Sequence, residues 1–189
     1  MQLRFQQGCS RRARLRYSGM TGRTTVTRTY LRMTRPDALR PARPVPNARV
    51  ENLEPCSPSR YRALYAAVGG GWHWHDRDAW SDARLAGHLA DPAVSVHLFV
   101  VGNEPAGYFE LQRHDDGDVE LVYFGLLPEQ IGKGLGGAML TAATTVAWRQ
   151  RATCVWLHTC TLDHPHAIAN YRARGFEEFK QGTYEATLP

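Results

Sequence analysis

Hydrophobic residues alternate with polar residues along several segments of the chain, and this period of two predicts β-strands. The expected strands are residues 47–53, 94–101, 106–114, 119–127 and 153–160. Polar turns that contain glycine, at 102–105 and 115–118, join the middle three. The sequence therefore predicts an antiparallel meander over residues 94–127, whose last strand is its most apolar.

Apolar residues at helical spacing predict four helices, so the fold class is α/β. Three of them are expected over residues 58–68, 82–89 and 138–148. Ser57 and Ser81 suit the N-caps of the first two, because a serine hydroxyl accepts a hydrogen bond from the first turn. The fourth is expected to begin at Asp163 or His164 as N-cap and to close at Gly175, which can adopt a positive φ.

A glycine-rich loop lies between the strand 119–127 and the longest helix. Its glycines are Gly132, Gly134, Gly136 and Gly137. Glycines at a helix N-terminus let several main-chain N–H groups approach one anion, so the loop predicts a phosphate site. The spacing fits neither a Walker loop nor a dinucleotide-binding G-x-G-x-x-G, and a plain turn with a helix cap is the alternative interpretation.

Two motifs resemble those of the GCN5-related N-acetyltransferases, the GNAT family. The run Ile131-Gly132-Lys133-Gly134-Leu135-Gly136 resembles that family's acyl-CoA loop, Gln/Arg-x-x-Gly-x-Gly/Ala. A later motif, Asn-x-x-Ala-hydrophobic-x-Leu-Tyr-x-x-x-Gly-Phe, is matched by Ala167-Ile168, Tyr171 and Gly175-Phe176. Three positions depart from the family: Ile131 replaces Gln or Arg, His164 replaces Asn, and Asn170 replaces Leu. The resemblance covers about residues 50–189 and implies a mixed, mostly antiparallel sheet flanked by helices, with a splayed central strand.

The resemblance implies a site for acetyl-CoA as the acyl donor. Its pantetheine arm would run beside the central strand, and its pyrophosphate would bind the main-chain N–H groups of the glycine loop. The residues expected to contact it are Phe124, Gly125, Leu126, Ile131, Gly132, Lys133, Gly134, Leu135, Gly136, Gly137 and His164.

Two residues are expected to carry the chemistry. Tyr171 matches the tyrosine that protonates the departing thiolate in many GNAT enzymes, and a packed helix tyrosine is the alternative. Glu120 aligns with the strand glutamate that accepts the proton in the histone-acetylating branch, and an outward-facing strand residue is the alternative. Glu110, His114 and His158 are the reserve candidates for this base.

The segment Trp72-His73-Trp74 follows three glycines and combines flat aromatic rings with polar edges. In the GNAT family this region shapes the acceptor site, so Trp72, His73 and Trp74 are expected to line it. A hydrophobic plug under a loop is the alternative. The histidines of the chain lack zinc-type spacing, so no metal is expected.

Charge is distributed very unevenly along the chain. Residues 1–49 hold 12 Arg and a single acid, Asp37, which gives a formal charge of +11, whereas residues 50–189 carry −6. The first segment, rich in Arg, Thr and Pro, is expected to be a disordered extension, and the domain is expected to span 50–189. Its composition also resembles a transit peptide, and translation from Met20 or Met33 is a further interpretation.

Composition limits the partners. The acidic domain argues against reading the pI of about 9.2 as a nucleic-acid signal, except through the Arg-rich segment. Nothing is apolar for long enough to be a signal peptide or to cross a bilayer, and Cys9, Cys56, Cys154 and Cys160 show no paired spacing. We therefore expect a cytoplasmic protein with reduced thiols. Homodimers are common in similar proteins, but no stretch specifies an interface.

These observations predict an acetyl-CoA-dependent N-acetyltransferase that acts on a primary amine by direct transfer in a ternary complex. The acidic domain with its aromatic wall suits a cationic small molecule as well as a protein amine. A non-catalytic CoA-binding regulatory module of the same fold is the alternative function.

Overall fold

The computed structural model describes residues 22–188, which form a single seven-stranded sheet in the order β2-β3-β4-β5-β6-β1-β7. All neighbouring strands are antiparallel except β5 and β6. The strands are β1 (Gly22–Met33), β2 (Ala48–Asn52), β3 (Val94–Val101), β4 (Glu104–Arg113), β5 (Val119–Leu126), β6 (Val155–Cys160) and β7 (Glu177–Leu188). The helices are α1 (Pro58–Gly69), α2 (Asp82–Leu89), α3 (Leu135–Arg149) and α4 (Ala167–Ala173), with short 3-10 turns at Pro36–Ala38 and Pro128–Gln130. The predicted mixed, mostly antiparallel sheet flanked by helices is confirmed.

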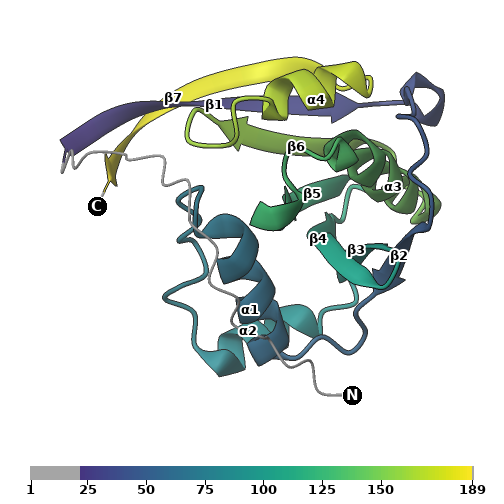
Figure 1. Cartoon of the computed structure of the whole chain (residues 1–189). Coiled ribbons are helices and arrows are strands. Elements are labelled where there is room, and N and C mark those ends of the chain that lie inside the picture. Colours follow the sequence, from purple (N-terminus) through teal and green to yellow (C-terminus); the bar gives the residue numbers. More distant parts are fainter. Residues whose placement is uncertain (1–21, 189) are drawn as a thin grey trace.

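The helices cover both faces of the sheet and define two hydrophobic clusters. On one face, α1 and α2 contribute Tyr61, Tyr65, Val68 and Leu85. On the other face, α3 packs its apolar side over β5 and β6, and Tyr171 of α4 joins the same cluster. Figure 1 shows α1 and α2 together below the sheet, away from α4. Any cavity that opens between β5 and β6 can therefore be reached by residues from both layers.

Local signals placed the first two helices correctly. The hydroxyl of Ser57 accepts a hydrogen bond from the main-chain N–H of Arg60, and Ser81 caps α2 through Arg84 in the same way. The cap predicted for the last helix is wrong. Its N-cap residue is His166, which makes no side-chain cap. Asp163 instead accepts hydrogen bonds from the hydroxyl of Thr159 and the main-chain N–H of Cys160, so it fixes the end of β6.

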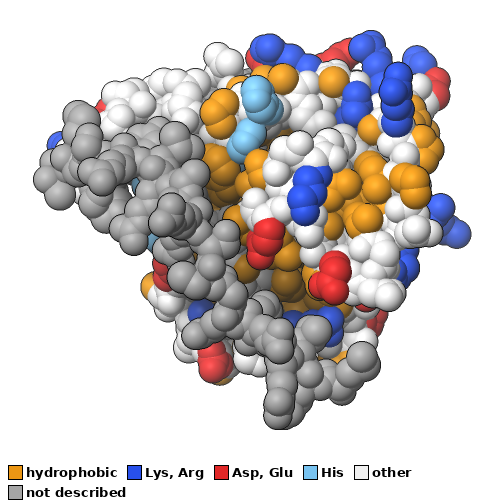
Figure 2. Space-filling model, in the orientation of Figure 1, with side chains coloured by type: hydrophobic (Ala, Val, Ile, Leu, Met, Phe, Trp, Pro, Cys, Tyr) orange, Lys and Arg blue, Asp and Glu red, His pale blue; other side chains and the backbone are white. Residues whose placement is uncertain are grey.

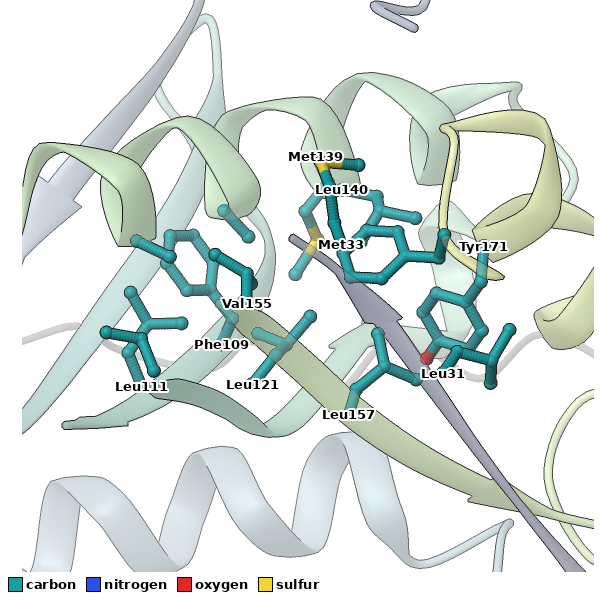
Figure 3. Packing of buried hydrophobic residues seen from close by; sticks show 14 of the residues in the cluster. Leu31, Met33, Phe109, Leu111, Leu121, Met139, Leu140, Val155, Leu157 and Tyr171 are labelled. Atoms are coloured by element: carbon teal, nitrogen blue, oxygen red, sulfur yellow. The ribbon is translucent and has the colours of Figure 1, made fainter. Parts of the chain in front are cut away.

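Strand β1 corrects the predicted domain boundary. Residues 22–33 are part of the sheet and pair with β6 on one side and β7 on the other. Leu31 and Met33 are buried, and Figure 3 shows both side chains among the core residues, Leu31 beside Tyr171 and Met33 beside Met139. The prediction of a disordered extension is therefore wrong for residues 22–49, because the chain after β1 also packs against the core through Ala38, Leu39 and Val45. The part of that prediction for residues 1–21 lies outside the described residues.

Strand β7 also has no counterpart among the predicted elements. It pairs with β1 from Gly22 to Arg32, and the two long strands run together along the top of Figure 1. In the sheet order β7 follows β5, β6 and β1, so it is the edge strand on this side of the sheet.

The inclusion of β1 changes the charge of the folded part. All 18 Asp and Glu residues lie beyond residue 21, and so do 18 of the 23 Lys and Arg residues. The described fold is therefore electrically balanced, not acidic as predicted for residues 50–189. Figure 2 shows both acidic and basic side chains on the face it draws. Net charge thus gives no reason to prefer a cationic acceptor.

Three further observations concern residues 22–188. Cys56, Cys154 and Cys160 are free thiols there, whereas Cys9 lies outside the described residues. None of the described helices has both the length and the apolar character that a membrane span requires. In the same part of the chain no group of three or more His, Cys, Asp or Glu side chains could hold a metal ion.

Candidate functional site

Strands β5 and β6 separate after two residue pairs. They pair in parallel only at Val119 with Val155 and at Glu120 with Trp156. Beyond these pairs, β5 continues to Leu126 while bonded to β4 alone. The main-chain groups on the β6 side of this segment thus have no strand partner within residues 22–188. An unpaired strand edge of this kind can bind an extended ligand with amide groups, because buried main-chain groups require hydrogen bonds.

A β-bulge lies where the two strands diverge. On the β4 side, Glu110 pairs with Tyr123 and Leu111 pairs with Leu121, so Val122 is the extra residue on β5. A bulge bends its strand and increases the local twist. The bulge therefore gives a local physical reason why β5 leaves β6 at this point.

The opening between the strands is a cavity of about 480 Å³. This volume is within the usual range for small-molecule sites. Its wall comes from six parts of the chain: β1, the segment after α1, β5, the glycine loop with the start of α3, β6 with α4, and β7. The predicted residues that line it are Trp72, His73, Trp74, Phe124, Gly125, Leu126, Ile131, Gly132, Gly134, Leu135, Gly136, Gly137, His164 and Tyr171.

The glycine loop has the geometry of an anion site. Gly132 and Gly134 have φ values of +85° and +75°, and Gly134 is the N-cap residue of α3. No side chain caps this helix, so the main-chain N–H groups of its first turn remain available to an anion. Lys133 is the one predicted loop residue that does not line the cavity. Its ammonium group donates a 3.1 Å hydrogen bond to the side chain of Gln130 instead.

Tyr171 lies at the cavity wall, opposite the segment of β5 that has no β6 partner. Its side chain is 7% exposed and packs near the rings of Phe124 and Phe176. Burial raises the pKa of its phenol above the ordinary value of about 10. The hydroxyl therefore stays protonated at neutral pH, which is the form that a proton donor needs.

The aromatic wall connects the two ends of the cavity. The ring of Trp72 meets His164 edge to face at 5.1 Å, and Trp74 lies 4.9 Å from the ring of Tyr123. Gly125 allows this packing: a Cβ there would fall 2.3 Å from a methyl group of Val68 on α1. The predicted acceptor wall and the predicted donor residues are thus parts of one continuous surface.

Glu120, the predicted base, does not line the cavity. Its carboxylate lies 3.2 Å from a ring nitrogen of His114. Burial raises the pKa of Glu120, and the hydrogen bond from His114 opposes this effect. The structure thus brings Glu120 and His114 to each other, near the start of β5, and neither residue lines the cavity.

Glu110, a reserve candidate, is fully buried and fully engaged. Its carboxylate accepts hydrogen bonds from Tyr61 and from Arg77, the latter at 2.8 Å, and it lies 2.9 Å from a ring nitrogen of His88. Glu110 therefore stabilises the fold through these partners. It does not line the cavity and cannot contact a molecule bound there.

His158 is the reserve candidate that does line the cavity. It lies on β6 opposite Tyr30, and its ring is open to the cavity. Burial and then the nearby charge of Arg28 lower the pKa of His158 below 6.5, while Asp163 and Asp76 oppose this shift. The imidazole is therefore neutral at neutral pH and able to accept a proton.

Several cavity residues were not expected from the sequence, and Arg28, Tyr184 and Asp76 are the ones among them that matter most for charge and hydrogen bonding. Arg28 comes from β1 and Tyr184 from β7, the two strands that the analysis did not predict. Asp76 follows the aromatic wall and accepts a 3.4 Å hydrogen bond from Tyr123. The alternation of threonine with larger side chains in residues 22–33 was the available signal for β1.

Comparison with known sequences connects this geometry to an enzyme family. The sequence model described as "Acetyltransferase (GNAT) family" matches residues 54–176, which is well over half of the chain. The match contains α1, the meander, the glycine loop and Tyr171. No curated protein sequence matches the chain.

Solved structures agree in fold. A GCN5-related N-acetyltransferase from Kribbella flavida superposes with a TM-score of 0.62 at 21% identity, over 87% of this chain and 59% of its own. A second one, from Sphaerobacter thermophilus, gives 0.63 at 17% identity, over 85% and 51%. An aminoglycoside acetyltransferase from an uncultured soil metagenomic sample, solved with trehalose, gives 0.55 at 13% identity, over 68% and 87%. The chain thus spans about half to three fifths of the first two.

Proposed function

Because the chain belongs to the GNAT family of acetyltransferases, we propose that it transfers the acetyl group of acetyl-CoA to a primary amine, directly and within one ternary complex. The observation that carries this proposal is the continuity of the cavity. It joins the unpaired edge of β5, the glycine loop at the start of α3, and an aromatic wall on the acceptor side.

The cavity residues fit a CoA donor. The free edge of β5 from Phe124 to Leu126 offers main-chain hydrogen bonds to the amides of pantetheine, as a neighbouring strand would. The open space at Gly132 and Gly134, where an added Cβ would meet nothing within 4 Å, leaves room for a pyrophosphate against the main chain. Acetyl-CoA supplies the activated thioester, and side chains of the cavity donate and accept the protons.

Tyr171 is the proposed proton donor. In the transfer the amine nitrogen forms a bond to the acetyl carbon, the carbon–sulfur bond breaks, and the sulfur takes up a proton. The phenol of Tyr171 holds such a proton at neutral pH, since burial disfavours its ionised form. No cysteine is needed as a covalent carrier, because the nucleophile is the substrate amine.

His158 is the residue best placed to remove the proton from the attacking amine. Of the four candidates for the base, it is the one that lines the cavity, and it is neutral at neutral pH. Glu120 could act only through water or through His114, because its carboxylate lies outside the lining. We therefore propose His158 as the general base that accepts this proton.

The first experiment measures acetyl-CoA binding by calorimetry with the full chain, followed by release of free CoA thiol across a panel of amines. Binding with thiol release on one class of amine supports the proposal. Binding with no release on any amine favours the alternative, a non-catalytic CoA-binding module. Absence of binding contradicts both functions.

The Tyr171→Phe variant tests the proton donor. It should lower kcat by about 10²-fold and leave the KM for acetyl-CoA nearly unchanged, because proton donation matters only as the bond to sulfur breaks. Tyr108→Phe is the matched control: it removes a hydroxyl that is buried outside the cavity without a hydrogen-bond partner in residues 22–188. An unchanged kcat in Tyr171→Phe would remove this residue from the mechanism.

The pH profile tests the base. In the parent protein, kcat/KM should fall as the pH drops through the lowered pKa of His158, because the protonated ring cannot accept a proton. The charged groups that face this ring are Arg28, Asp76 and Asp163. His158→Gln should lower kcat/KM and abolish this fall, whereas Glu120→Gln should keep it. The opposite result would return the role to Glu120.

A further inference from the structure

Arg28 stands in the cavity without an acidic partner. It is half-buried and lines the wall near His158. Its Nε is buried and has no hydrogen-bond partner among residues 22–188, and no carboxylate in that part of the chain forms a salt bridge with it. A charged group whose Nε–H is shielded from water and has no partner is costly, and an anion in the cavity would offset that cost.

The neighbouring strands hold Arg28 in place but do not neutralise it. In the sheet, Arg28 lies between Cys160 on β6 and Gly182 on β7, and neither residue has a charged side chain. The guanidinium carbon lies 4.9 Å from the ring centroid of Tyr184, a cation–π contact that supports one face of the group. This packing orients the planar guanidinium. Its hydrogen-bonding neighbours are the phenols of Tyr30 and Tyr184, not a carboxylate, and its Nε has no partner within residues 22–188.

A carboxylate faces the same cavity from the other layer. Asp76 comes from the segment after α1, is exposed to the cavity, and forms no salt bridge within residues 22–188. His158 lies within electrostatic range of both Asp76 and Arg28. This side of the cavity therefore presents the cation Arg28, the neutral base His158 and two carboxylates, Asp76 and Asp163. Asp163 already accepts hydrogen bonds from Thr159 and from the main chain at Cys160, which leaves Asp76 as the free carboxylate of the two.

We propose that the acceptor is a small amine that also carries a carboxylate, with an amino acid as the simplest example, and that Arg28 binds this carboxylate. This inference rests on the proposed function, because it concerns the acceptor of the same transfer. A guanidinium matches a carboxylate with two parallel N–H···O hydrogen bonds, which fixes the orientation of the molecule as well as its position.

The arrangement assigns a place to each end of such an acceptor. With the carboxylate at Arg28, the ammonium group is attracted toward Asp76. His158 can then take the proton that leaves the nitrogen, so that the free amine can attack. An amine without the carboxylate would leave Arg28 unpaired, and it should be a poor acceptor.

The test uses the full chain with matched acceptors: the common L-amino acids, each with its methyl ester. CoA thiol release gives kcat and KM, and calorimetry measures binding of the same compounds to the protein in the presence of CoA. At least one free amino acid should bind and react, with its ester about tenfold to a hundredfold weaker, as expected for loss of hydrogen bonds to a charged group.

Arg28→Gln should raise the KM and the dissociation constant for that amino acid by about tenfold to a hundredfold, and should leave the affinity for acetyl-CoA unchanged. Arg32→Gln is the matched control. Arg32 lies four residues away on β1, and its guanidinium packs over Phe179 at the same 4.9 Å, but it does not line the cavity. This variant should behave like the parent protein.

Three results would overturn the inference. Esters that react as well as acids, equal effects of the two arginine variants, or no binding of any amino acid to the CoA complex would each remove the role of Arg28. All three leave the proposed function standing if acetyl-CoA binds and another amine is acetylated. Failure of acetyl-CoA itself to bind is the separate result that would remove the proposed function.

Discussion

The carboxylate of Glu110 on strand β4 accepts a 2.8 Å hydrogen bond from Arg77, a residue of the segment between α1 and α2. Both side chains are buried, and Arg77 is enclosed by the rings of Tyr61, Trp80 and Tyr123. This ion pair connects the central sheet to the segment that carries the aromatic wall. It therefore holds the aromatic wall of the cavity against β5.

We predict that Glu110→Gln strongly destabilises the fold. The neutral amide would leave the buried charge of Arg77 uncompensated, a change that usually costs about 3–5 kcal/mol. Urea unfolding should show this as a large drop in the midpoint. Asp37→Asn is the control, because Asp37 forms an exposed ion pair with Arg35 and its loss should leave the midpoint essentially unchanged. Similar midpoints for the two variants would show that the Glu110 pair does not hold this segment.

Because His97 is buried, we predict that the protein loses stability in mild acid. Both ring nitrogens of His97 lack hydrogen-bond partners within residues 22–188, and burial lowers its pKa to about 4. The unfolded chain, with a pKa of about 6.5, binds the proton more readily, so stability is retained above that pH and lost as the pH falls toward 4. When the pH falls from about 7 to about 5, His97 should lower the free energy of unfolding by about 2 kcal/mol.

His97→Phe should remove that part of the pH dependence, because the ring stacks on Phe109 and a phenyl group keeps the contact. The measurement is urea unfolding of both proteins at the two pH values. A variant that loses as much stability in acid as the parent protein would show that another group is responsible.

Much of the fold could be predicted because its signals are local. The meander was predicted from alternation and polar turns, and the starts of α1 and α2 from their serine caps. Strands β1 and β7 were missed because their partners are distant in sequence and their outer residues are polar. In β1, Arg23, Thr25 and Arg32 are exposed, and the charge of the segment masked its alternation.

The glycine loop and Tyr171 were easier to predict as cavity residues than the opposite wall. They lie on short continuous motifs, and the conformation of the loop depends mainly on local backbone geometry. The opposite wall brings together β1, β6, β7 and the segment after α1, so Arg28 and Tyr184 become neighbours only in the folded chain. The choice among four candidate bases likewise depended on which side chains reach the cavity, and a strand pattern does not determine this.

Because β1 lies inside the sheet, we predict that only shortened chains that keep it can fold. A chain that starts at Met33 lacks the strand between β6 and β7, including the buried residues Val26 and Leu31. It should show no cooperative unfolding transition, because β7 would lose its partner and the core would be open. A chain that starts at Gly22 keeps every described strand and is the control. A cooperative transition at the same midpoint in both chains would show that β1 is dispensable.

Leucine substitutions at Gly134 and at a control glycine can distinguish the backbone strain of the loop from its role in binding the ligand. Gly134 and Gly102 both have positive φ values, +75° and +63°, and a Cβ at either would meet nothing within 4 Å. Replacement by leucine should therefore cost similar stability at both, about 1–2 kcal/mol. At Gly134 the side chain would also occupy the approach to the first turn of α3, so calorimetry should show acetyl-CoA affinity reduced by about tenfold or more. At Gly102, in the turn between β3 and β4, affinity should stay at the parent value. Equal affinities in the two variants would mean that the donor does not place its phosphates on this loop.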